Sequence, residues 1–402
     1  APSVDRLFTL KSERWLRTLQ ILAGLSLLIA FGVWCASPYL LKLPPSPSQI
    51  LGPFDTRGSL FDVITGLLQT AVVAGLLYWI LKQAWETSST QRKADDPLAR
   101  WKWAAVAVTA VELVVANAWL IFTAPAPLWT ETAPVTAAIQ QHEKTLVASD
   151  RIDPPRFFRG SYFSWAPPSF AKAGSLQRME QIARWDHDSL SHKYSLGSGF
   201  ALVESYGSLK LLDYESLLLQ ARVLSTTKVD GVSVPAAGVL RMTGCEYLVL
   251  PESAVIPYAD KIVDPGVKLP ENVSLWRMKR TLPRVSIVHH VEQLPSLTDP
   301  LDIAAVDERS ATVLLEQRDG KSTFRDFRQV AVVETDDRLL PELTQPRAEA
   351  TGSASSSSAS TVVNTPQHVR VKASLSEPGL LVLADSWGPG WVASRQSATQ
   401  AS

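Results

Sequence analysis

The chain has 402 residues, enough for two or three domains, and its 39 basic and 39 acidic residues cancel. A chain with neither net charge nor a basic block is unsuited to nucleic-acid binding, which depends on clustered Lys and Arg. Charged residues make up only 19% of the chain and Trp occurs 13 times, and both features indicate contact with a lipid bilayer.

Three apolar runs, at about 19–37, 63–81 and 103–124, each approach the roughly 20 apolar residues that a membrane-spanning helix needs. Basic residues precede the first run and separate the second from the third, whereas the loop between the first two contains only Lys42 and Arg57. Basic loops favour the cytoplasm. We therefore predict a multi-pass protein of the plasma (inner) membrane, with a cytoplasmic N-terminus and everything after about residue 125 extracytoplasmic.

Glu112 lies near the centre of the third run. A carboxylate at this depth is costly unless it is protonated, paired or facing a cavity. Glu112 is therefore a candidate substrate-binding residue. The alternative is a neutral side chain hydrogen-bonded to a neighbouring helix, assisted by Thr109 one turn away.

Residues 125–300 alternate between helical and strand patterns, which predicts an extracytoplasmic mixed α/β domain. An amphipathic pattern predicts a short helix within 135–149, and a second helix is expected at 213–224 with Asp213 as its N-cap. Apolar runs predict strands within 244–251, 272–279 and 284–291.

The remainder, 301–402, has a mostly β pattern and predicts an incomplete β-sandwich. Strands are expected at 311–317 and 328–335, followed by a hairpin over 368–387 with its turn at Pro378 and Gly379. A Ser-rich insert at about 341–365 cannot bury a core and is predicted to be disordered. The fold class expected is thus three transmembrane helices, an extracytoplasmic α/β domain and a β-sandwich that is truncated after Ala393.

The densest polar stretch, RWDHDSLSHKY at 184–194, supplies the other candidate binding residues: Asp186, Asp188, His192 and Lys193. Carboxylates and imidazoles this close together can orient a phosphate or a cation, but the spacing matches no established metal motif, so we predict no metal site. The alternative is a polar loop after a helix.

Aromatic residues shortly before that stretch have two interpretations as well. They form either a sugar-stacking platform or the core of the domain: Phe157, Phe158, Tyr162, Phe163 and Trp165. His289 and His290 are expected on opposite faces of one strand, so they do not make a single site. The two cysteines, Cys35 and Cys245, are expected to be buried thiols.

Several phrases follow the apolar helices in a set order: GFALVESYGSLKLLDYESLL, GCEYLVLPE, LWRMKRTLPRVSIVHHVE, LTDPLDIAAVDE and GLLVLADSWGPGWVA. This order resembles the YfhO-like bacterial membrane proteins over most of the chain from about residue 60. In that family a Pro-Gly-Trp follows the late strand, as Pro389, Gly390 and Trp391 do here. Family members carry many more membrane helices and a further closing strand, so the resemblance implies a C-terminal portion.

The resemblance implies a multi-pass enzyme of the glycosyltransferase type-C architecture that uses a polyprenyl-phosphate sugar donor. The catalytic acid of such enzymes lies in an outer loop after the first membrane helix. No residue here matches that position, because Asp55 lies in the wrong loop, so the catalytic residue is unknown.

Three functions stay open. The chain is part of a glycosyltransferase-like membrane protein that acts on lipid-linked sugars and envelope polymers, or it is a non-enzymatic module. Such a module would be anchored in the lipid bilayer and bind envelope glycan or a partner protein outside the cell. A transporter component, the third function, rests on Glu112 alone.

Overall fold

The computed structural model describes residues 13–42, 47–48, 52–90, 98–118, 125–146, 152–160, 165–175, 177–204, 211–225, 228–229, 232–263, 266–318, 320–337, 341–344, 357–365, 367–385 and 391–396. The chain divides into two compact units, one formed by Ala1–Pro125 with Ser169–Gln181 and the other by Ala126–Pro168 with Ile182–Ser402. We call them the helical unit and the α/β unit.

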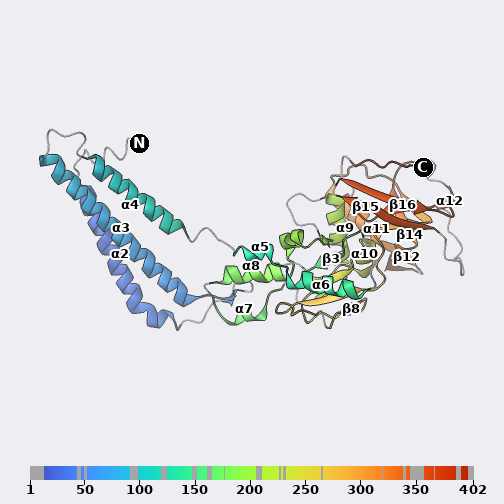
Figure 1. The fold of residues 1–402 in the computed structure, drawn as a ribbon, viewed down its shortest axis with the longest axis horizontal. Coiled ribbons are helices and arrows are strands. Elements are labelled where there is room, and N and C mark those ends of the chain that lie inside the picture. Colours follow the sequence, from blue (N-terminus) through green and yellow to red (C-terminus); the bar gives the residue numbers. More distant parts are fainter. Residues whose placement is uncertain are drawn as a thin grey trace. The chain divides into compact units, whose positions relative to one another are not determined.

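Three long helices make up most of the helical unit: α2 (Glu13–Leu40), α3 (Thr56–Thr90) and α4 (Ala99–Asn117). Figure 1 shows them side by side, and both α2 and α4 pack on α3. A small core forms where they meet, built from Ile80, Leu81 and Ala84 of α3 with apolar side chains of the other two helices. Trp79 also contacts Trp101 edge-on, with ring centroids 5.6 Å apart.

Two helices are long and apolar enough to cross a membrane, Glu13–Leu40 and Thr56–Thr87. Only 11% of each apolar stretch is buried by protein, so most of its apolar surface is free to face lipid. The predicted third crossing is not confirmed. α4 is helical, but it carries Arg100, Lys102 and Glu112, and residues 119–124 of the predicted run lie outside the described part.

A five-stranded sheet forms the centre of the α/β unit, in the order β4-β3-β7-β9-β8. Its strands are β3 (Arg156–Arg159), β4 (Ala201–Leu202), β7 (Tyr247–Leu250), β8 (Ala259–Lys261) and β9 (Ser274–Met278). β3 runs parallel to β4 and β7, whereas β9 runs antiparallel to β7 and β8. All four residues of β7 are fully buried, as a continuous apolar run in a central strand requires.

Helices connect and cover these strands: α5 (Pro127–Thr130), α6 (Pro134–Thr145), α9 (Leu212–Val223), α10 (Ala237–Met242), α11 (Ile303–Leu314) and a 3₁₀ helix (His192–Gly197). α7 (Pro168–Lys172) and α8 (Arg178–Asp188) cross the boundary between the units. The predicted helices near 135–149 and 213–224 are thus α6 and α9. The predicted cap is wrong, because Leu211 caps α9 and Asp213 lies inside it.

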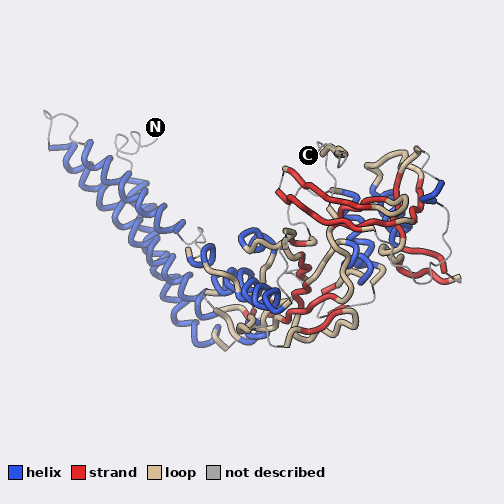
Figure 2. The backbone as a smooth tube through the Cα atoms, turned by 45° about the vertical axis from the view of Figure 1, so that its right-hand side comes forward, coloured by secondary structure: helices blue, strands red, loops and turns tan. Residues whose placement is uncertain are grey.

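The remaining strands form two-stranded sheets. The antiparallel pairs are β10 (Val285–Val288) with β17 (Leu380–Leu383), β12 (Leu315–Arg318) with β13 (Lys321–Phe324), β15 (Ser358–Thr365) with β16 (His368–Ser374), and β5 (Lys228–Val229) with β6 (Val232–Ser233). β11 (His290–Leu294) pairs in parallel with β14 (Val330–Glu334). In the helical unit β1 (Pro47–Ser48) pairs with β2 (Gly52–Pro53). Figure 2 shows β15 and β16 as a long two-stranded ribbon.

These pairs correct several predictions. A sandwich needs two larger sheets packed face to face, so the incomplete β-sandwich is not confirmed in the described strands. The predicted hairpin over 368–387 is wrong, because β16 pairs with β15 and β17 with β10. Most of the expected strand at 311–317 is the end of α11.

The Ser-rich insert is also shorter than predicted. Residues 358–365 form β15, and Pro341–Thr344 form the short helix α12. Residues 345–356 lie outside the described part, as do 397–402, so the predictions of disorder and truncation there stay predictions.

Candidate functional site

An open pocket of about 300 Å³ lies in the α/β unit, between the α5–α6 segment and the 3₁₀ helix. We call it the aromatic pocket, and its main side chains are Trp129, Gln140, His187, Lys193 and Tyr194. The Trp129 and Tyr194 ring centroids lie 5.5 Å apart with the planes inclined by 32°. Trp129 is 62% exposed, so a large aromatic face is offered to solvent next to polar groups.

A cation lies against both rings. The Lys193 Nζ is 5.8 Å from the centroid of Trp129 and 5.4 Å from that of Tyr194, within the range of cation–π attraction. Lys193 itself is exposed, so its remaining N–H donors can reach a ligand.

His187 connects the pocket to the end of α8. Its Nδ1 lies 2.8 Å from a carboxylate oxygen of Asp188, and its Nε2 lies 3.1 Å from the Glu131 carbonyl oxygen. The ring also meets Tyr194 edge-on at 5.7 Å. Both nitrogens are therefore engaged, and His187 fixes the tyrosine in place.

Asp186 lies in the same turn and is half-buried, as is its neighbour Asp188. Burial raises the pKa of Asp186 from 3.8 to about 6, although the charges of Arg159 and Lys193 and a hydrogen bond from Ser191 act in the opposite direction. One buried carboxylate oxygen of Asp186 has no hydrogen-bond partner among the described residues. The electrostatic contact with Lys193 couples this carboxyl group to the aromatic pocket.

Arg159, the cation that lowers the pKa of Asp186 most strongly, is a core residue. It is only 2% exposed and donates to the Ser189 carbonyl and hydroxyl oxygens. Its guanidinium lies 5.1 Å from the Trp165 ring centroid and 5.0 Å from that of Trp185. These contacts hold the cation in place and leave it inaccessible to a large ligand.

The structure brings together part of the predicted site. Lys193 lines the aromatic pocket, Asp188 supports it through His187, and Asp186 lies behind it. The side chain of His192 lies outside the described part. Glu112 belongs to the helical unit, where it lies half-buried on α4, and the Thr109 hydroxyl donates to the Ala105 carbonyl rather than to Glu112.

The burial of the aromatic and cysteine side chains tests two further predictions. Phe157, Phe158 and Trp165 are buried, so they form core and the sugar-platform interpretation is wrong for them; Tyr162 and Phe163 lie outside the described part. Cys245 is buried as predicted, whereas Cys35 is exposed on α2. Within the described ranges no group of three His, Cys, Asp or Glu side chains could hold a metal ion.

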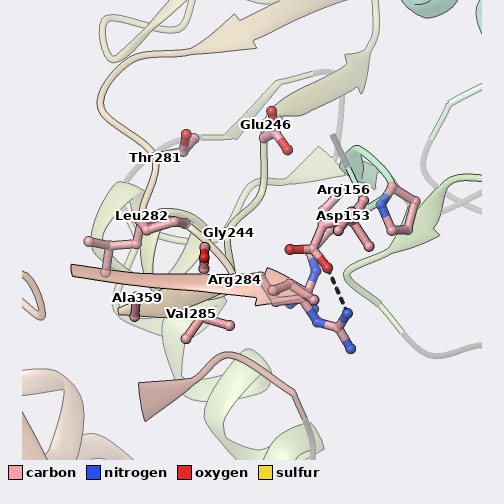
Figure 3. Close-up of a pocket in the computed structure, with 14 residues that line it drawn as sticks. Asp153, Arg156, Gly244, Glu246, Thr281, Leu282, Arg284, Val285 and Ala359 are labelled. Atoms are coloured by element: carbon pink, nitrogen blue, oxygen red, sulfur yellow. Dashed lines mark hydrogen bonds and ion pairs between the residues drawn. The ribbon is translucent and has the colours of Figure 1, made fainter. Parts of the chain in front are cut away.

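A second cavity, of about 440 Å³, was not foreseen from the sequence (Figure 3). We call it the arginine cavity. Figure 3 shows Asp153, Arg156 and Arg284 gathered at one side and Glu246 and Thr281 at another. The Nη1 of Arg284 donates to Asp153 at 2.8 Å.

Asp385, just beyond β17, ties the arginines of this cavity together. Arg284 donates to both of its carboxylate oxygens, and Arg156 donates to one of them and to the Ala384 carbonyl. Burial opposes ionisation of Asp385, but these hydrogen bonds and charges outweigh burial and lower its pKa. The network holds the end of β17 against the start of β3.

A third cavity, of about 590 Å³, adjoins the same arginine and is mostly apolar. We call it the apolar cavity, and it is lined mainly by Ala201, Leu202, Val203, Leu211, Leu217, Met242, Val382 and Leu383. Arg156 lines both this cavity and the arginine cavity.

Comparisons with protein-family models, with curated proteins and with solved structures found no match for this chain, so neither the resemblance to YfhO-like proteins nor a function is supported by similarity.

Proposed function

We propose that this chain is a membrane-anchored protein whose α/β unit binds glycan of the bacterial cell envelope in the aromatic pocket. The observation that carries the proposal is the exposed Trp129 ring beside Tyr194, with Lys193 against both rings. The C–H faces of a sugar ring are apolar and stack on aromatic faces, while its hydroxyls take hydrogen bonds from nearby polar groups. Gln140 and Lys193 supply such groups here.

Attachment to the membrane is supported by α2 and α3, which have the length and composition of membrane-spanning helices. The side on which the α/β unit lies depends on α4. Three crossings from a cytoplasmic N-terminus place the unit outside the cell, whereas two place it inside. Labelling an introduced cysteine at Ser253, an exposed position of the α/β unit, with an impermeant maleimide in intact cells separates the two arrangements.

The binding experiment uses the full chain in lipid nanodiscs, applied to an array of bacterial surface polysaccharides. We expect Trp129→Ala to weaken binding by about tenfold, since loss of one aromatic stacking partner is worth about 1 kcal/mol or more. Trp391→Ala is the matched control, because Trp391 is also exposed, at 41%, but does not line the pocket. Equal binding by the two variants would contradict the proposal.

The glycosyltransferase hypothesis, with its polyprenyl-phosphate sugar donor, stays a prediction that rests on the resemblance alone. Recovering the reading frame on both sides of the locus tests it. Many more apolar helices upstream, with an Asp or Glu in the first outer loop, would favour the enzyme over a binding module.

A further inference from the structure

The arginine cavity and the apolar cavity share one lining residue, Arg156, and differ sharply in chemistry. We propose that the two together bind an uncharged amphiphile, with a hydroxyl-bearing head in the arginine cavity and a single alkyl chain in the apolar cavity. This site is separate from the aromatic pocket, with which it shares no lining residue.

The charges of the arginine cavity argue for an uncharged head. Its lining contains two arginines and two carboxylates, so the charges balance. Each also has an opposite partner: Arg284 donates to Asp153 and to Asp385, Arg156 donates to Asp385, and Arg277 donates to Glu246 at 2.7 Å. A phosphate or carboxylate head would have to displace one of these pairs and the charge-assisted hydrogen bonds within it, which an uncharged head leaves in place.

Hydroxyl chemistry fits the same cavity. Thr281, Ser360 and Thr361 all line it. The Thr361 hydroxyl oxygen is buried and lacks a hydrogen-bond partner among the described residues, which is unfavourable until a ligand supplies one. A head bearing several hydroxyls can both donate to and accept from such groups.

The apolar cavity would hold the alkyl chain of the ligand. Its walls come from β4, α9 and β17, and most of its lining side chains are aliphatic. Its charged lining residues are Arg156, which it shares with the arginine cavity, and Asp385, to which Arg156 donates. A cavity of this size with few convergent polar groups is typical of small-molecule sites, and an alkyl chain is the ligand part that such walls favour.

Two isosteric substitutions with opposite chemistry test the two halves. Thr361→Val removes the buried hydroxyl and keeps the shape, whereas Val382→Thr places a hydroxyl in the apolar wall. The matched control is Val362→Thr, on the same strand as Thr361 but exposed and outside both cavities. We expect each of the first two variants to weaken ligand binding by about fivefold, the value of one net hydrogen bond or one misplaced hydroxyl, and the control to leave it unchanged.

The probe is an alkyl glucoside with a photoreactive diazirine at the end of its chain, used below its micellar concentration with the full chain in nanodiscs. Mass spectrometry then maps the cross-linked peptides, which separates labelling of this site from labelling of α2 and α3. We expect saturable labelling of the segments around Leu217 and Val382. Excess unlabelled octyl glucoside should suppress it, and an alkyl phosphate should not.

Four results would overturn the proposal. Labelling confined to the membrane-spanning helices would show that the cavities bind no such probe. Equal labelling by a diazirine alkanol without the sugar would show that the arginine cavity does not recognise a hydroxyl-bearing head. Stronger competition by the alkyl phosphate would show that it prefers a charged head. If Thr361→Val keeps both its thermal stability and its labelling, the Thr361 hydroxyl does not contact the ligand, which contradicts the placement of the head.

Discussion

The buried carboxyl group of Asp186 gives the sharpest prediction about stability. Its pKa in the folded protein is about 6, against an ordinary value of 3.8, so the folded state holds the proton more tightly than the unfolded chain. The stability that protonation confers is therefore fully present below pH 3.8 and is lost as the pH rises through about 6. Asp186→Asn keeps the shape of the side chain and removes the charge.

The magnitude follows from the two pKa values. At pH 7 the ionised Asp186 costs about 3 kcal/mol relative to a neutral side chain of the same shape, and at pH 4 the cost falls to about 0.5 kcal/mol. We expect Asp186→Asn to stabilise the α/β unit by up to about 3 kcal/mol at neutral pH and to have little effect near pH 4.

Urea unfolding of the full chain in nanodiscs, followed by tryptophan fluorescence, measures this difference across pH 4 to 7.5. Trp165 and Trp185 report on the right region, because both rings contact Arg159. The control is Asp188→Asn, which weakens the contact with His187 and should destabilise by about 1 kcal/mol or less. A gain from Asp186→Asn that does not change with pH, or no gain at all, would refute the reasoning.

Two further predictions concern the packing of the α/β unit. Arg284→Met removes the two-point partner of Asp385, which is exposed and keeps Arg156, and should lower the free energy of unfolding by about 1 kcal/mol. Because the pKa of Asp385 is lowered, this loss should shrink as the pH falls below about 4, and a constant loss in urea titrations would contradict the assignment. Gly160→Ala would place a methyl group 2.6 Å from the Cγ1 of Val232, so we expect a loss of about 1 to 3 kcal/mol. Gly197→Ala meets no atom within 4 Å, and an equal urea midpoint for both alanine variants would count against this explanation.

The hydrophobic pattern of the sequence correctly predicted the elements whose conformation depends on neighbouring residues alone. The continuous apolar run at 247–250 is the central strand β7, and the amphipathic stretch after Pro134 is α6. The strand predicted at 311–317 is wrong because an apolar run of this length fits a buried strand as well as the end of a helix, and the helix that starts after Asp302 extends to Leu314. Pro378 and Gly379 gave a turn signal without revealing which strand β17 would pair with.

The candidate site, too, could be predicted from the sequence only in part. The stretch at 184–194 was recognised as a polar cluster, and three of its four predicted residues are described in or behind the aromatic pocket. Sequence analysis did not identify Trp129. It lies more than fifty residues before the stretch at 184–194, in a proline-rich connection with no motif that indicates a binding site. Its contact with Tyr194 is a tertiary contact, which a single sequence does not display.

The clamp between Arg156 and Asp385 has a consequence for biogenesis. These two residues are separated by 229 positions in the chain, and β10, which starts at Val285, has no partner until β17 is made from Leu380 onward. During synthesis, β3 and β10 emerge well before the residues that complete them, so the edge of β10 stays open until residues 380–385 are available. A partly made chain therefore exposes an unpaired strand edge, to which chaperones or another copy of the chain can pair first. Closing the α/β unit is a late event, tied to the final part of synthesis rather than to the folding of its central sheet.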